Sequence, residues 1–231
     1  PVGYAADPQE NVVYVSKHDN QTLFDILAFK LPTDLAMEER VRLQTAALAT
    51  VAFAQGMPFF HAGSDLLRSK SLDRNSYDAG DLFNAIDWTG ADSGFGVGLP
   101  LAAENRSDWQ VMRPLLENPA LVPSQADAER ASTWFRALLQ TRASSPLFRL
   151  RTADEVQRRV RFHNTGPDQL PGLIVMSIDD RVGADLDPWH DAVLVVINAG
   201  PERRTLSVEG FEGANLRLHP AFAALDDERL S

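Results

Sequence analysis

The 231-residue sequence contains no cysteine, which excludes both a disulfide framework and a thiolate metal site. It also lacks an apolar run near the ~20 residues that a membrane-spanning helix needs, so we predict no membrane partner. Basic residues are in the minority: 22 Lys and Arg stand against 32 Asp and Glu, giving a net charge of −10. Without a basic stripe we predict no nucleic-acid partner, whereas neutral sugars fit an acidic surface without penalty.

Several signatures of known chemistry are missing. The five histidines form no i,i+4 pair and no zinc spacing, so we assign no metal site; they are His18, His61, His163, His190 and His219. There is no Gly-x-Ser-x-Gly elbow, which argues against a serine hydrolase of that type. No Gly-x-Gly-x-x-Gly run or P-loop is present, so a phosphate cradle is not predicted.

The first third of the sequence has an α/β pattern. Residues 12–15 (VVYV) are a β-branched and aromatic run that predicts a buried strand. Helical spacing follows over 22–31, with Asn20 or Thr22 as its cap, and again over 37–54, where Gly56 closes the helix. Residues 57–61 predict a second buried strand. The order strand, helix, helix, strand is the repeat of a βα barrel or a doubly wound sheet, with both polar strand ends on one side.

The remainder divides near Ser144-Ser145-Pro146. Before it, residues 68–108 form a long irregular segment that we expect to bury its aromatic residues, followed by helices over 109–116 and 125–142. After it, the period becomes strand-like, which predicts a small antiparallel β domain. Its expected strands are 156–164, 173–178, 192–198, 204–208 and 215–218.

Two clusters of side chains suit a polyhydroxylated ligand. His18 and Asp19 follow the first strand, where an imidazole can donate to hydroxyls and a carboxylate can stabilise positive charge at a reacting carbon. The second cluster lies in the long loop and consists of Arg74, Asn75, Tyr77, Asp78, Asp81 and Asn84. An ordinary strand-to-helix turn and a surface loop with Asx-turns explain the same residues, and their chemistry alone leaves both interpretations open.

Longer motifs resemble one family. YVSKHDNQTLFD (14–25) resembles the seventh-strand motif of pullulanases and limit dextrinases, debranching members of the α-amylase superfamily (glycoside hydrolase family 13). FFHAGSDLLRSKSLDRNSYDAGDLFNAIDW (59–88) is similar to their eighth-strand region, and RLQTAALATVAFAQGMPFF (42–60) and SSPLFRL (144–150) continue the likeness in order. The resemblance implies the last two βα units of a (β/α)₈ TIM barrel in residues 1–145. Residues 146–231 would then be a partial antiparallel β-sandwich domain, apparently truncated.

The resemblance also implies an activity, the retaining hydrolysis of α-1,6-glucosidic linkages in pullulan, amylopectin or limit dextrins. Asp19 would be the transition-state stabiliser, and His18 would bind hydroxyls of the sugar at the cleaved bond. Lys17 and Asn20 would line the same cleft, and Arg74, Asn75, Tyr77 and Asp81 would contact neighbouring glucose units. Calcium is a structural ion to consider in this superfamily, but the sequence assigns it no ligands and we predict no other cofactor.

The resemblance supplies no nucleophile and no general acid. In this superfamily these residues lie on the fourth and fifth barrel strands, and this chain matches only the last two. Such carboxylates must lie roughly 5 Å apart, and Asp19 alone cannot supply both. The chain starts Pro-Val-Gly-Tyr without an initiator Met, so we expect a C-terminal fragment that is inactive alone. Its localisation stays open, with a secreted or cell-surface bacterial parent among the options.

Three other interpretations remain at this point. The chain could be a glucan-binding module without catalysis, built from the long loop and the β domain. It could belong to a superfamily enzyme that cuts α-1,4 bonds, since only the likeness of the long loop favours α-1,6. A generic α+β interaction domain would require the motif likeness to be accidental.

Overall fold

The computed structural model describes residues 5–225 and 227–230 and has a mixed helix and sheet architecture. Contacts divide the chain into two compact units that interleave along the sequence. Unit 1 takes Pro1–Val13, Ala49–Pro58 and Ala137–Ser231, and unit 2 takes Tyr14–Leu48 and Phe59–Arg136. The predicted division into 1–145 and 146–231 remains a prediction, and the two units are described separately below.

Two long helices contribute residues to both units: α2 (Met37–Ala52) and α6 (Gln125–Ser144). Both were predicted from helical periodicity, and each boundary differs from its prediction by two residues at the C-terminal end. The Ser124 hydroxyl accepts a hydrogen bond from the Asp127 amide at 3.3 Å, so this serine caps α6.

Unit 2 contains α1 (Leu23–Lys30), which lies within the predicted segment 22–31. The Thr22 Oγ1 atom accepts a hydrogen bond from the Asp25 amide at 3.1 Å, which satisfies one free amide of the first turn. The helix ends at Lys30 because the residue before Pro32 is pushed out of the α region, and Leu31 is extended. The apolar face of α1 packs into a core whose buried members are Phe24, Ala28, Val41, Leu67, Leu72, Phe95, Met112, Leu115, Leu121 and Ala131.

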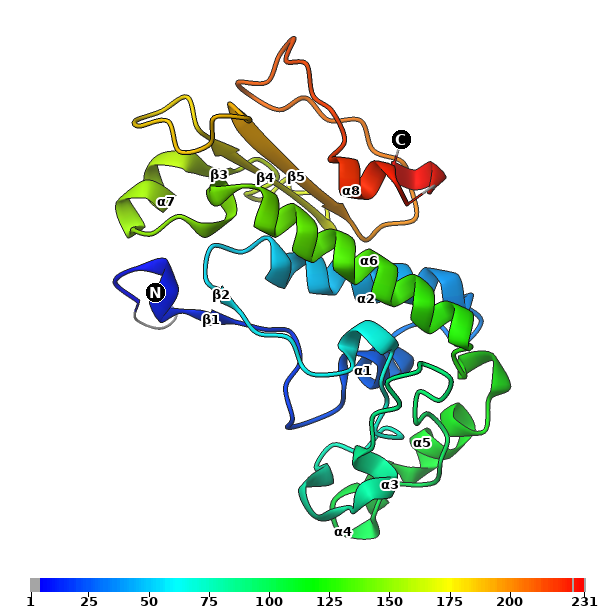
Figure 1. Cartoon of the computed structure of the whole chain (residues 1–231). Coiled ribbons are helices and arrows are strands. Elements are labelled where there is room, and N and C mark those ends of the chain that lie inside the picture. Colours follow the sequence, from blue (N-terminus) through cyan, green and yellow to red (C-terminus); the bar gives the residue numbers. More distant parts are fainter. Residues whose placement is uncertain (1–4, 226, 231) are drawn as a thin grey trace. The chain divides into compact units, whose positions relative to one another are not determined.

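The long segment of unit 2 is irregular, as predicted, and is interrupted by the short helices α3 (Asp81–Asn84) and α4 (Ala102–Asn105) before α5 (Trp109–Leu116), whose bounds are those predicted (Figure 1). Its aromatic residues do not all bury. Phe83 and Phe95 are buried, but the Tyr77 side chain is 96% exposed and Trp88 is 68% exposed. The expectation of buried aromatics is therefore wrong for these two rings.

In unit 1, β1 (Val12–Val13) and β2 (Met57–Pro58) run parallel, with Val12 opposite Met57 (Figure 1). The parallel pairing agrees with the predicted repeat, but the strands are shorter than predicted and not buried: Val12 and Met57 are about half exposed. A parallel strand is buried only when neighbours cover it on its open side and on both faces. Among the described residues the sheet has only these two strands, so their side chains stay open.

Gly56, just before β2, is needed for a reason other than the predicted helix cap. It is absent from the positive-φ residues, so it does not end α2 in the left-handed conformation. A Cβ atom at this position would lie 2.7 Å from the Asn11 carbonyl oxygen and 2.7 Å from a Val13 methyl carbon. Glycine therefore lets the chain entering β2 approach β1 closely.

Unit 1 also contains an antiparallel sheet of β3 (Val160–Phe162), β4 (Leu173–Asp179) and β5 (Ala192–Asn198), in the order β3-β4-β5. The prediction of a small antiparallel sheet is confirmed. The prediction of a strand over 156–164 is largely wrong, because α7 (Ala153–Arg159) occupies the first half of that segment. Thr152 accepts from the Glu155 amide at 3.2 Å, a helix start that the β-rich appearance of the run concealed.

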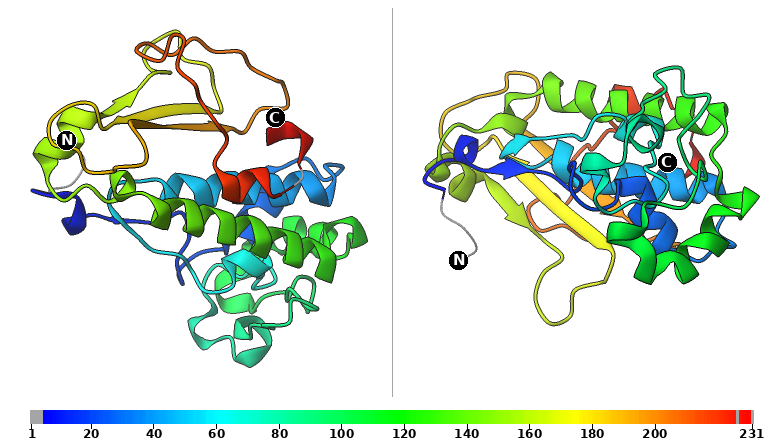
Figure 2. Two further views of the ribbon diagram at one scale, coloured as in Figure 1. Left: turned by 45° about the horizontal axis from the view of Figure 1, so that its top comes forward. Right: turned by 90° about the horizontal axis from the view of Figure 1, so that it is seen from below.

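The predicted strands 204–208 and 215–218 are absent. After β5 the chain runs as irregular coil, orange in Figures 1 and 2, until the short helix α8 (Pro220–Ala223). A strand is stabilised by ladder hydrogen bonds to a neighbour, and no strand among the described residues pairs with either segment. A strand-like sequence pattern alone was therefore not enough to form a strand in these two segments.

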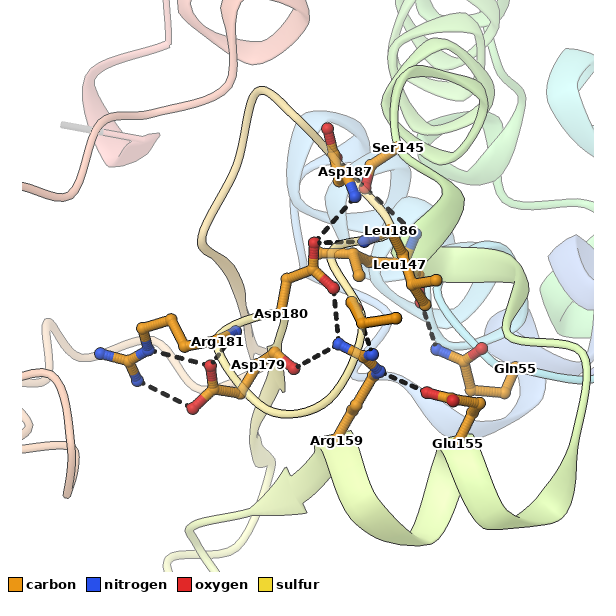
Figure 3. Close-up of polar contacts among 11 residues, drawn as sticks. Gln55, Ser145, Leu147, Glu155, Arg159, Asp179, Asp180, Arg181, Leu186 and Asp187 are labelled. Atoms are coloured by element: carbon orange, nitrogen blue, oxygen red, sulfur yellow. Dashed lines mark hydrogen bonds and ion pairs between the residues drawn. The ribbon is translucent and has the colours of Figure 1, made fainter.

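A buried ionic network fixes α7 to the loop after β4 in unit 1 (Figure 3). The Arg159 guanidinium is fully buried and donates to Glu155 Oε2 at 2.5 Å, Asp180 Oδ1 at 2.5 Å and the Ala184 carbonyl at 2.6 Å. The other carboxylate oxygen of Asp180 accepts from the Asp187 amide at 2.8 Å. Each charge in this network is therefore paired and hydrogen-bonded.

Among the helices of the described part, none is both long and apolar enough to cross a membrane.

Candidate functional site

Unit 2 places the Lys17–Asn20 segment at its surface, in a turn that leads into the cap of α1. Lys17 and Asp19 form an ion pair, and His18 Nε2 lies 3.4 Å from Asp19 Oδ1. The His18 side chain is 82% exposed and that of Asp19 is 51% exposed. Asn20 has φ of +61°, a left-handed conformation that asparagine tolerates better than most residues. The structure thus brings these four predicted residues together in one turn.

The charges in this turn support one another. The hydrogen bond from Lys17 lowers the pKa of Asp19, and the charges of His18, Lys17 and Lys70 lower it further. The hydrogen bond to Asp19 in turn raises the pKa of Lys17. Asp19 is therefore a carboxylate at neutral pH, with negative charge available at the surface of unit 2.

His61, which follows β2, joins the Lys17–Asn20 turn through Ser16. Its Nδ1 atom lies 3.5 Å from Ser16 Oγ, and its Nε2 atom lies 3.4 Å from Arg68 Nη1. Because a guanidinium only donates, Nε2 is the acceptor and the proton lies on Nδ1, facing Ser16. Burial lowers the pKa of His61 to about 4, and the charges of Arg68, Lys70 and His18 act in the same direction. This ring is neutral at pH 7.

Beneath the turn lies a pair of buried charges. Lys70 Nζ donates to the His18 carbonyl oxygen at 2.9 Å, and the Lys70 residue is only 1% exposed. Asp25, on α1 and fully buried, accepts from the Lys70 amide at 2.8 Å and from the Ser69 hydroxyl. Burial raises the pKa of Asp25, although these hydrogen bonds oppose the rise.

The second predicted cluster is exposed and lies on a braced loop. The side chains of Arg74, Asn75, Tyr77 and Asp81 all reach solvent. Asp73 and Asn105 brace the loop from inside: Asn105 Nδ2 donates to Asp73 Oδ1 at 3.1 Å, and the same oxygen accepts from the Asn75 amide at 2.8 Å.

Asn84 closes the other end of this loop, since its side chain hydrogen-bonds Ser76 and the Gly80 carbonyl. In residues 5–225 and 227–230, no hydrogen bond or ion pair joins the second cluster to the Lys17–Asn20 turn directly. The connection is indirect: Arg68, which contacts His61, also donates to the Asn84 carbonyl at 2.7 Å.

Sequence reasoning did not assign a site role to Lys70, Asp25 or Arg68. Each lies within the quoted family-like motifs, but the Asp25–Lys70 and Lys70–His18 contacts join positions more than forty residues apart. A charged residue among otherwise core-forming positions was the available signal: Asp25 sits between Phe24 and Ala28, which face the core.

The described residues provide no acidic or histidine cluster that fits a metal ion. Within the part of the chain that the structure describes, no three His, Asp or Glu side chains gather so that they could hold one. No step is therefore assigned to calcium.

Comparison with known proteins identifies the class of this chain. The family model described as alpha-1,6-glucosidases, pullulanase-type, C-terminal, matches residues 90–231, which is more than half of the sequence. The chain therefore belongs to this pullulanase-type family.

Individual relatives agree with that assignment. Pullulanase 1, chloroplastic, of Arabidopsis thaliana is 43% identical over 99% of this chain and 24% of its own length. Pullulanase of Klebsiella pneumoniae is 46% identical over 94% of this chain and 20% of its own length. A crystal structure of Klebsiella pneumoniae pullulanase complexed with maltotriose matches with a TM-score of 0.91 and 44% identity, over 97% of this chain and 21% of that one. This chain thus spans about a quarter or less of these relatives.

Proposed function

We propose that this chain is part of a debranching enzyme that hydrolyses α-1,6-glucosidic linkages in pullulan, amylopectin or limit dextrins. The observation that carries the proposal is the exposed Lys17–Asn20 turn in a chain of the pullulanase-type family. The turn offers what a sugar-cleaving site needs on one wall: an ionised carboxylate and an exposed imidazole. A branched α-glucan is the partner that fits it.

Each residue of the turn receives a role in this proposal. The Asp19 carboxylate stabilises the positive charge that develops at the anomeric carbon, and His18 hydrogen-bonds hydroxyls of the same sugar. Lys17 keeps Asp19 ionised and Asn20 lines the cleft. On the braced loop, Arg74, Asn75, Tyr77 and Asp81 contact neighbouring glucose units, where the exposed ring of Tyr77 can stack on a sugar face.

The proposal also assigns the strands and helices of this chain to two domains of the parent enzyme. In this proposal β1 with α1 and α2, and β2 with the later helix α6, are the last two βα units of a (β/α)₈ barrel, and β3 to β5 begin a C-terminal β-sandwich. The retaining double displacement then needs a nucleophilic carboxylate and a general acid that other barrel strands supply. We propose that the 231-residue chain does not hydrolyse glucans by itself.

The test compares the full-length protein with the 231-residue chain on pullulan, in a reducing-sugar assay. We expect turnover by the full-length protein and none by the chain. Proton NMR of the first products should show the α anomer before mutarotation, because an α linkage cleaved with retention releases an α reducing end. Release of β-anomer product would contradict the retaining mechanism, and turnover by the isolated chain would contradict its dependence on other strands.

Two further substrates, linear amylose and amylopectin, decide between this proposal and its rivals. An enzyme acting on α-1,4 bonds would cleave linear amylose and leave the α-1,6 linkages of pullulan intact. A glucan-binding module would be retarded in an amylopectin gel but would release no reducing ends, even as the full-length protein.

A further inference from the structure

Lys70 occupies a position that a lysine reaches only at a cost. It is 1% exposed, although burial of an ammonium group is strongly unfavourable unless it is paired. Its Nζ atom donates to the His18 carbonyl at 2.9 Å, on the turn that carries Asp19. A long cationic side chain is thus placed under the backbone of the proposed catalytic turn, beyond the reach of solvent.

The backbone on both sides of Lys70 adopts strained conformations. Leu67, Ser71 and Leu72 have φ of +58°, +52° and +68°, which are left-handed values that non-glycine residues seldom adopt. Such conformations are costly for non-glycine residues and persist only where the surroundings enforce them. Leu67 and Leu72 are fully buried in the core of unit 2, so the core holds the strained segment in place.

Asp25 fixes the middle of this segment from α1. It accepts the Lys70 amide and the Ser69 hydroxyl, so the carboxylate orients the loop, and the loop orients the ammonium group. Three links therefore run from helix α1 through the loop to the His18 carbonyl. A neutral side chain of similar size could fill the space under the His18 carbonyl. The presence of a cation there therefore needs an explanation beyond packing.

The charges that surround Lys70 supply that reason. Burial lowers the pKa of Lys70, and the Arg68 cation adds to the decrease, while the carboxylates of Asp73, Asp25 and Asp19 oppose it. Asp73 is fully buried, and its Oδ2 atom has no hydrogen-bond partner among the described residues, so its charge is available to the ammonium group. The cation in turn lowers the pKa of Asp19.

We propose that Lys70 is a positioning residue of the glycosidase site, which clamps the His18 carbonyl and supplies a buried positive charge under Asp19. The inference rests on the proposed debranching function. Loss of the clamp lets the turn move, and a misplaced charge costs transition-state stabilisation more than ground-state binding. Removal of the charge makes protonation of Asp19 easier.

The test is kinetic and uses the full-length protein with pullulan. Lys70→Met removes donor and charge at similar volume, and we expect kcat to fall about 10- to 100-fold with KM changed by less than about threefold. The acid limb of the kcat/KM profile should move to higher pH, because Asp19 must be ionised and its pKa rises. Lys70→Arg, which keeps a charged donor, should restore part of kcat. Lys30→Met, at an exposed position of α1, serves as the matched control with unchanged kinetics.

The outcomes separate the two proposals. Wild-type protein that cannot hydrolyse pullulan overturns the debranching function and this inference with it. An active wild type whose Lys70→Met variant keeps its kcat and its acid limb overturns the role of Lys70 alone. If Lys70→Met does not fold, Lys70→Gln decides, since it keeps an N–H donor without charge. An unshifted acid limb in that variant contradicts the electrostatic part, and a kcat that falls about 10- to 100-fold although the donor is kept contradicts the clamp.

Discussion

Two charged clusters, one in each unit, use their side chains in opposite ways. In unit 2, Lys17, His18 and Asp19 are partnered with one another yet remain open to solvent, so a ligand can reach them. In unit 1, Arg159 and Asp180 are almost completely buried, and the guanidinium is satisfied by protein atoms alone (Figure 3). An exposed ion pair contributes little to stability, whereas a buried charge that loses its partner is very costly. The first arrangement is suited to binding and the second to fixing architecture.

Arg159→Met provides the largest expected effect. It leaves Asp180 buried without its cation, which should lower the local free energy of unfolding by about 3–5 kcal/mol. Hydrogen exchange of the β4 amides, measured by mass spectrometry on the full-length protein, should accelerate by about 100-fold or more, since every 1.4 kcal/mol is tenfold.

The matched control for this substitution is Arg181→Met. Arg181 pairs with Asp179 at 2.9 Å, but both side chains are partly exposed. We expect at most about 1 kcal/mol of change. Similar acceleration of exchange in the two variants would break the contrast between buried and exposed charge.

A smaller effect is expected from His61. Its pKa of about 4 in the folded protein lies below the ordinary value near 6.5, so the unfolded chain binds the proton first as pH falls. Stability from this group is present above pH 6.5 and is lost as the pH decreases toward 4, by on the order of 2–3 kcal/mol.

The check compares thermal midpoints of the wild type and of His61→Gln across this pH range. The variant carries no titrating ring, so its midpoint should decline less steeply than that of the wild type between pH 6.5 and 4. Parallel curves would show that another group accounts for the acid sensitivity.

Local signals predicted the structure where the determining contacts are local. The Thr22 cap and the bounds of α5 follow from neighbouring residues, and the structure confirms them. The β-rich appearance of 156–164 misled because the cap at Thr152 outweighs strand propensity over the following turn.

Tertiary contacts decide the rest. The exposure of β1 depends on how many strands flank it, and the hydrophobic periodicity of the sequence does not reveal that number. The Lys17–Asn20 turn was predicted as a cluster because its residues are adjacent in sequence. The Lys70 ammonium under His18 was not, because 52 residues separate the two positions and strained backbone brings them together.

The central claim is that Asp19, in the exposed turn, acts directly on the reacting sugar. The most direct measurement is kcat on pullulan for Asp19→Asn in the full-length protein, with Glu104→Gln, an exposed acid of α4, as the control. Asparagine keeps the shape of the side chain and removes its charge, so we predict a kcat lower by about 10²–10³-fold or more, with the control unchanged. A kcat within about twofold of the wild type, in a folded variant, would contradict the account.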